Sequence, residues 1–247
     1  MRVRCAILVI ATVVLAFTPS PRAHWEEENH WPAGSVIAMH LRMGAAPLAL
    51  VDGSADWDSV METALNSWTA VLNGVVFQAV RDPDVEAVSQ DDINNVFWGE
   101  DVYGEPFGDG VLAITLSTYT LPDHATIESD VVFNRAIPWN SYRGDLRTSP
   151  GGGGLYDLQR VALHEFGHVL GLGHPDDHDQ VVTAIMNSRA SNIDALQSDD
   201  VEGASTIYPR IAVPSASAGA SQPSLAPAQP GLPLFSALES THLLRTR

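Results

Sequence analysis

The chain has 247 residues and a formal net charge of −17, from 13 basic and 30 acidic side chains. This charge repels nucleic acid and anionic lipid surfaces, so we expect no nucleic-acid partner and no stable membrane association. Hydrophobic residues make up 45% of the chain and charged residues 17%, which excludes wholesale disorder and a protein of many membrane spans. The length suits one packed domain with appendages, and we expect a monomer.

The N-terminus is typical of an export signal. Arg2 and Arg4 precede an apolar stretch, residues 5–17, that is short for a membrane span. We therefore predict a signal peptide over residues 1–23 and a secreted, extracellular protein. An uncleaved membrane anchor and a periplasmic location are the alternatives. The one cysteine, Cys5, lies within this signal, so the mature chain has to hold any metal through histidine and carboxylate side chains.

A short polar leader and a folded domain are expected next. Residues 24–34 are polar, and we predict that they are solvated. The folded domain is predicted over residues 35–211. It begins with a strand over 35–43, where apolar and polar residues alternate. An amphipathic helix is predicted over 56–72, where apolar residues recur at three- and four-residue spacing.

Further strands follow an Asn73-Gly74 turn. The β-like runs cover residues 75–80, 95–98, 111–119 and 130–133. One helix among several strands indicates an α+β fold with a sheet layer.

A second helix and a tail complete the chain. The glycine run 151–154 breaks the chain, and apolar residues over 155–169 then lie along one helical stripe. Ala, Ser and Pro dominate from residue 212 to 230, a composition that buries too little apolar surface to offset chain entropy. We therefore predict a flexible tail over 212–247.

The segment 164–174 reads HEFGHVLGLGH and matches the pattern HExxHxxGxxH. Residues four apart on a helix project about 40° from each other, so His164 and His168 can aim at one ion. Gly171 can adopt the left-handed conformation that ends the helix and returns His174 to the same ion. Three neutral imidazoles leave a coordination position for water, which is the arrangement of a catalytic Zn²⁺.

The carboxylate of this motif has a defined chemical role. Zinc lowers the pKa of its bound water toward about 7, and a neighbouring carboxylate can remove the proton and later deliver it to a departing amine. Glu165 is placed for that role as general base. The expected reaction is hydrolysis of an amide without an acyl-enzyme.

Two further segments extend the pattern. Residues 184–186, AIM, are similar to a Met-turn that carries Met186, and residues 196–209 are similar to a domain-closing helix. On these motifs the chain resembles the metzincin clan and, within it, the matrixin-like zinc metallopeptidases, over roughly 35–209 and most strongly from Leu155 onward. The resemblance implies a metzincin fold of the α+β class. Its parts are a twisted, mostly parallel five-stranded sheet with an antiparallel edge strand, an active-site helix, the Met-turn and a C-terminal helix.

The resemblance also implies substrate and metal sites. Leu112, Ala113 and Ile114 would belong to the edge strand and pair with an extended protein or peptide substrate by β-augmentation. Ile114 and Val132 stand where animal matrixins have histidine ligands for a structural zinc, so we expect a single catalytic Zn²⁺. Ca²⁺ is a second candidate cofactor, because related enzymes use it and the chain is acidic, but no calcium-binding loop is visible and we assign no calcium ligands.

Together these features predict a secreted zinc-dependent endopeptidase. The alternative is a catalytically inactive, secreted zinc-binding adhesion or interaction module of the same fold, because a motif does not by itself demonstrate turnover.

Overall fold

The computed structural model describes residues 24–209 and 238–245, apart from residues 25, 28 and 83–84. The predicted signal peptide, residues 1–23, therefore lies outside the described residues, as does most of the predicted tail. Among the residues that are described, no helix has the length and apolar character needed to cross a membrane.

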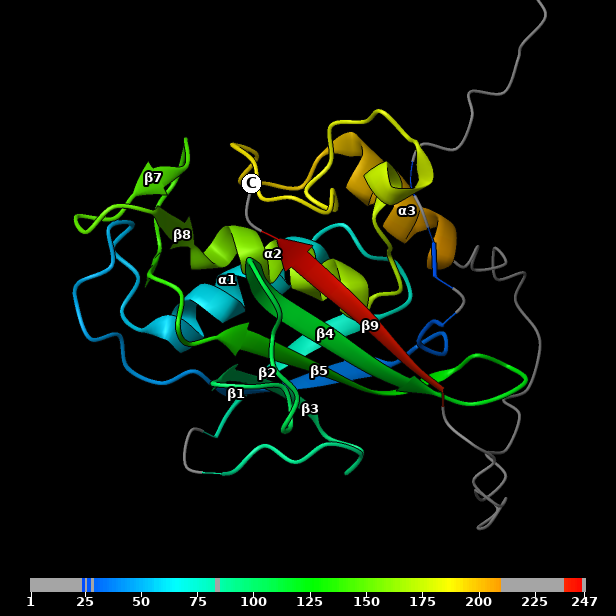
Figure 1. Ribbon diagram of the computed structural model, residues 1–247. Coiled ribbons are helices and arrows are strands. Elements are labelled where there is room, and N and C mark those ends of the chain that lie inside the picture. The colour runs from blue at the N-terminus through cyan, green and yellow to red at the C-terminus, as the bar shows by residue number, and fades with distance from the viewer. Residues whose placement is uncertain (1–23, 25, 28, 83–84, 210–237, 246–247) are drawn as a thin grey trace, which may run out of the picture.

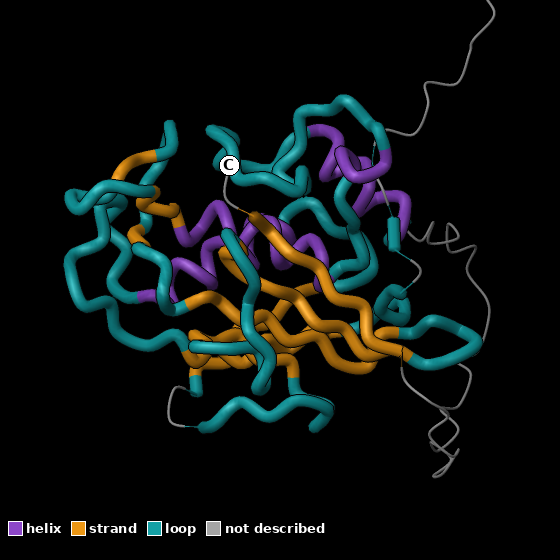
Figure 2. Tube along the Cα trace, viewed as in Figure 1, coloured by secondary structure: helices purple, strands orange, loops and turns teal. Residues whose placement is uncertain are grey.

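A six-stranded sheet forms the centre of the fold, in the order β2-β1-β3-β5-β4-β9 (Figures 1 and 2). Strands β2, β1, β3 and β5 are parallel to one another, and β4 is antiparallel to β5. These five strands confirm the predicted fold class. The bounds are β1 Val36–Arg42, β2 Val76–Arg81, β3 Asn94–Gly99, β4 Val111–Tyr119, β5 Thr126–Asn134 and β9 Leu238–Arg245.

Two helices pack against one face of this sheet (Figure 1). Helix α1, Trp57–Thr69, begins where the Asp56 carboxylate accepts a hydrogen bond from the Ser59 amide at 2.7 Å, which caps the helix. Helix α2, Leu158–Val169, crosses the same face and carries the histidine motif. A short 3₁₀ helix, η1, covers Pro175–His178, and helix α3, Ser198–Ile207, closes the domain as predicted.

The position of α2 is fixed by aromatic side chains. The indole N–H of Trp68 in α1 donates to the carbonyl oxygen of Leu163 in α2 at 2.8 Å. The rings of Phe77 in β2 and Phe166 in α2 lie 5.9 Å apart between centroids. All of these side chains belong to one buried core between the sheet and the helices. The helix that carries the histidines is therefore anchored on both of its neighbours.

A small second sheet was not predicted. It has the order β6-β8-β7, with β6 at Trp139–Asn140, β7 at Arg147–Thr148 and β8 at Gly154–Asp157. Strands of two to four residues are too short to show an alternating pattern in the sequence. Strand β8 leads directly into α2, so this sheet helps to place the start of that helix.

The prediction of a solvated leader is wrong for part of residues 24–34. Asn29 and Trp31 are buried. The indole N–H of Trp31 donates to the carbonyl oxygen of Val169 at 2.8 Å, at the last residue of α2. The hydroxyl of Tyr208 donates to the carbonyl oxygen of Leu170 at 2.8 Å. Each bond satisfies a carbonyl group at the C-terminal end of α2 that has no partner within the helix. The Trp31 amide also donates to the Tyr208 hydroxyl at 3.2 Å, so the leader is part of the packed domain.

The prediction of a flexible tail is also wrong for residues 238–245. This segment forms β9 and pairs antiparallel with β4, from Leu238 opposite Tyr119 to Arg245 opposite Val111. Strand β4 therefore lies inside the sheet and is not its edge. The composition of residues 212–230 gave no indication of this pairing, because pairing of strands rests on backbone groups that every residue except proline carries.

A buried carboxyl lies in the sheet at Asp130 in β5. It accepts hydrogen bonds from the Asn95 amide at 2.7 Å and from the Tyr103 hydroxyl at 2.5 Å. Burial raises the pKa of Asp130 to about 7, and the two hydrogen bonds oppose this shift without cancelling it. The folded state thus holds a proton on Asp130 more tightly than the unfolded state, where the pKa is about 4. The contribution of this bound proton to the stability of the fold is fully present below about pH 4 and is lost as the pH rises through 7.

We expect Asp130→Asn to flatten the pH dependence of stability. In the metal-free wild type, Asp130 alone should lower the free energy of unfolding by about 1.4 kcal/mol per pH unit between pH 4 and 7. The neutral amide cannot titrate, so the difference between the two proteins should change with that slope. Urea unfolding across this range measures it, with the exposed Asp123→Asn as a charge-matched control. If the free energies of unfolding of wild type and Asp130→Asn changed in parallel with pH, the raised pKa of Asp130 would be contradicted.

Candidate metal centre

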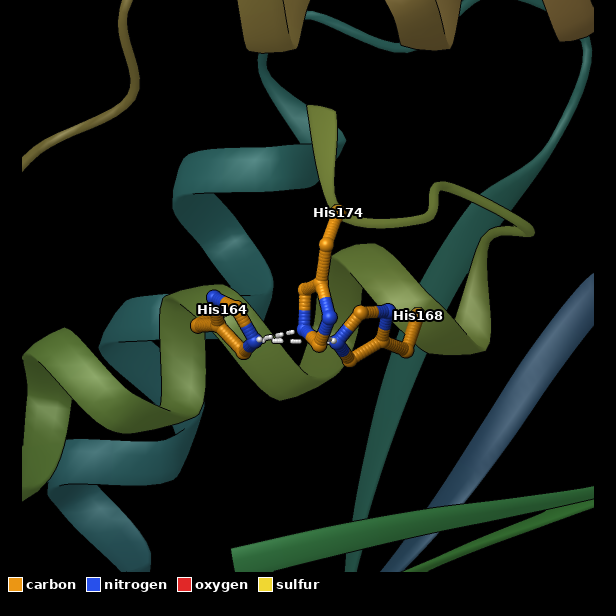
Figure 3. Close-up of side chains that lie close together, drawn as sticks. All are labelled: His164, His168 and His174. Carbon is orange, nitrogen blue, oxygen red and sulfur yellow. Dashed lines mark hydrogen bonds between the residues drawn. The ribbon is translucent and has the colours of Figure 1, made fainter. Parts of the chain in front are cut away.

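Three histidine side chains converge beside α2 (Figure 3). The Nε2 atoms of His164 and His168 lie 2.9 Å apart, those of His168 and His174 lie 3.0 Å apart, and those of His164 and His174 lie 3.1 Å apart. The exposed fractions of the three side chains are 1%, 0% and 9% in chain order. The structure therefore brings together all three predicted metal ligands.

The other nitrogen of each ring faces an oxygen atom. In chain order, the partners of Nδ1 are the carbonyl oxygen of Ile185 at 2.8 Å, the carbonyl oxygen of Leu172 at 2.7 Å and the carboxylate of Asp177 at 3.0 Å. Carbonyl and carboxylate oxygens accept hydrogen bonds, so Nδ1 carries the proton in each neutral ring. The lone pairs are then on the three Nε2 atoms, which point at one another.

This donor set fits a zinc ion. In a tetrahedral site with Zn–N distances of about 2.0–2.1 Å, neighbouring nitrogens lie about 3.3 Å apart. The three Nε2 separations are within a few tenths of an ångström of that value. A cation bound between the three Nε2 atoms would be coordinated by their lone pairs, which otherwise repel one another.

The turn at Gly171 brings His174 back to the helix. Gly171 has a φ of 90°, the left-handed conformation expected for it, and its amide donates to the carbonyl oxygen of His168 at 2.9 Å. A Cβ at this position would lie 2.3 Å from the carbonyl oxygen of Asn29 in the leader. Glycine is required here both for the backbone conformation and for the close approach of another segment.

Met186 packs against α2 between the first two ligands. A Cβ on Gly167 would lie 2.2 Å from the sulfur of Met186, and Met186 is 2% exposed. The turn that carries Met186 is tied to α3 by Asp200, whose carboxylate accepts hydrogen bonds from the amides of Ile185 at 3.0 Å and Met186 at 3.2 Å. Burial raises the pKa of Asp200 to about 6. The sequence motif did not identify Asp200, because its role depends on two distant segments.

The side chain of Glu165 extends from α2 to strand β4 of the sheet. Its side chain is fully buried, and its Oε2 accepts a hydrogen bond from the Thr115 hydroxyl at 2.6 Å. Its Oε1 has no hydrogen-bond partner among the described residues. Burial raises the pKa of Glu165 to about 8, and the bond from Thr115 opposes this shift. Thr115 was missed by sequence analysis, although its position in a strand next to the predicted substrate residues was a usable signal.

The predicted substrate-binding residues lie in β4, as expected, and they are buried. Leu112, Ala113 and Ile114 are at most 5% exposed. Ala113 stands opposite Leu244 and Ile114 opposite Leu243 in β9. In this structure a strand of the same chain therefore occupies the side of β4 that was assigned to a substrate.

The sequence profile of the family described as Matrixin matches residues 48–209. This chain belongs to the matrixin family. It is 32% identical to Metalloendoproteinase 4-MMP of Arabidopsis thaliana over 112 residues, which cover 45% of this chain and 30% of that protein. It is 32% identical to Metalloendoproteinase 2-MMP of the same plant over 151 residues, which cover 61% of this chain and 36% of that protein.

Among solved structures, the crystal structure of myroilysin matches with 18% sequence identity and a TM-score of 0.38, and the match covers 74% of this chain and 86% of that one. The matched segments span about a third of the length of the two plant relatives. The family match confirms the matrixin resemblance that the motifs around His164 and Met186 indicated.

Gly171→Ala should destabilise the domain and weaken its binding of Zn²⁺. The left-handed backbone conformation alone costs about 1–2 kcal/mol for alanine, and the carbonyl oxygen of Asn29 must also move. Gly74→Ala is the matched control, because Gly74 has a φ of 84° and a Cβ added there would meet no atom within 4 Å. Urea unfolding gives the stability, and chelator competition gives the Kd for Zn²⁺. Equal losses in both variants, with unchanged Zn²⁺ binding, would refute the close-approach argument.

Proposed function

We propose that this matrixin is a secreted, zinc-dependent endopeptidase. The observation that carries the proposal is the meeting of three Nε2 atoms within 3.1 Å of one another, each on a ring whose Nδ1 faces an oxygen. His164, His168 and His174 would hold the ion. When bound, Zn²⁺ would supply Lewis acidity for the scissile carbonyl group and lower the pKa of water.

Glu165 is the proposed general base. Its carboxyl is next in sequence to a metal ligand and is held by Thr115 at 2.6 Å, which restricts its rotation. The Glu165 carboxyl would be ionised more readily beside a divalent cation held by the neighbouring histidines, which would oppose the effect of burial on its pKa. The carboxylate then takes the proton of the attacking water and passes it to the departing amine nitrogen.

The proposed substrate is an extended segment of a protein or peptide. Strand β4 passes beside Glu165, since the Thr115 that contacts Glu165 lies within it. A peptide paired with Leu112, Ala113 and Ile114 would be held by backbone hydrogen bonds, which recognise an extended conformation more than a particular sequence. The names of the plant relatives, which describe metalloendoproteinases, support the same reaction.

Replacing Glu165 separates the chemistry from the binding of zinc. We expect Glu165→Gln to retain one Zn²⁺ per chain and to lower kcat/KM on a denatured casein substrate by about 10²–10⁴-fold, the usual contribution of general acid–base catalysis. The control is Glu202→Gln, which removes an exposed carboxylate from α3. Activity equal to wild type in Glu165→Gln would instead favour a zinc-binding interaction module.

Removing the metal should abolish hydrolysis reversibly. We expect a chelator to stop cleavage and stoichiometric Zn²⁺ to restore it, because three neutral imidazoles bind Zn²⁺ well. His168→Ala should lose the bound metal and the activity together. His178→Ala, an exposed histidine in η1 outside the three-ligand group, should keep both. Metal analysis of the purified proteins together with peptide cleavage assays decides this, and chelator-resistant cleavage would overturn the proposal.

A further inference from the structure

Strand β9 covers one whole side of β4. Eight pairs of residues are in register, and the two strands run antiparallel (Figure 1, β9 in red beside β4 in green). The other side of β4 is paired with β5 from Ala113 to Tyr119. A strand has only two sides on which it can form backbone hydrogen bonds, so β9 and a substrate cannot both pair with β4.

Strand β9 passes next to the residue that holds the candidate catalytic carboxyl. Thr115, which donates to Glu165, stands opposite His242, and Ala113 stands opposite Leu244. Leu244 is 1% exposed and belongs to the core that also contains Phe166 from the histidine helix. The segment is therefore seated in the region where the proposed function requires a peptide to bind.

We propose that residues 238–245 are an intramolecular, substrate-like occupant of the peptide-binding side of β4, and that this segment competes with substrates for the active site. The inference rests on the proposed function for its consequence, while the pairing itself is independent of catalysis. A segment tethered to the same chain has an effective concentration on the order of mM, so weak pairing is enough to lower the occupancy by substrate.

The pairing can be tested without any enzyme activity. Neighbouring amide groups in a strand point to opposite sides, so the double substitution His242→Pro and Leu243→Pro removes at least one N–H directed at β4. Made in the Glu165→Gln background, this variant should show at least ten-fold faster hydrogen exchange of the β4 amides that face β9. Exchange in α1 should not change, which excludes general unfolding.

A matched control places two prolines at Ala216 and Ser217, in the predicted tail but outside β9. This control should exchange like the Glu165→Gln parent. Equal exchange of β4 in the parent and in the His242→Pro, Leu243→Pro variant would overturn the inference.

The competition is then measured with Glu165 intact. The two prolines at positions 242 and 243 should lower the KM for a fluorogenic peptide several-fold and leave kcat unchanged, which is the pattern of a removed competitor. A synthetic peptide of residues 238–245 should inhibit this variant competitively. An unchanged KM, or a peptide that does not compete, would refute the competition.

The failure of each proposal has its own signature. If no variant hydrolyses any substrate with Zn²⁺ bound, but the prolines still speed exchange in β4, the endopeptidase proposal fails and the assignment of residues 238–245 as the strand that covers β4 holds. If the wild type and the proline variant cleave substrate equally and their β4 amides exchange equally, the endopeptidase proposal holds. The proposal that residues 238–245 occupy β4 then fails.

Discussion

The orientation of three imidazole rings by three oxygen acceptors is the interaction on which the candidate site depends. Two of these acceptors are main-chain carbonyl groups, at Leu172 and Ile185, so the ring positions follow directly from the path of the backbone. That path is set in turn by the left-handed turn at Gly171 and by the contact of Met186 with α2. A small change in either turn would misdirect a ring even if every ligand were retained.

Buried carboxyl groups hold the segments around this site where regular secondary structure is scarce. Asp200 binds the turn before Met186, and Asp157, at the start of α2, accepts a hydrogen bond from the Tyr142 amide at 3.0 Å. Burial raises the pKa of Asp157 to about 6. Each of these carboxyl groups loses favourable solvation on burial. In return it accepts hydrogen bonds from backbone amides that would otherwise be buried without partners.

The sequence predicted the parts of the fold that have a period. Helix α1, helix α2 and strand β1 were recognised because their apolar residues recur at helical or alternating spacing. The three histidines and Gly171 were recognised because their spacing is local. Thr115 and Asp200 were not, since each acts on a segment at least fourteen residues away. The leader around Trp31 and the strand β9 were misjudged for the same reason. Their composition predicted solvated segments, whereas their structure comes from hydrogen bonds with backbone groups far away in the sequence.

The contact between Met186 and Gly167 has a chemical consequence for the whole domain. The sulfur lies so close to the helix backbone that not even a methyl group fits between them. Conversion of that thioether to a sulfoxide would add an oxygen atom and a strong dipole to a side chain that is buried against the helix. Oxidation of Met186 would therefore disturb the helix that carries His164 and His168, and the burial of the methionine limits its access to oxidants.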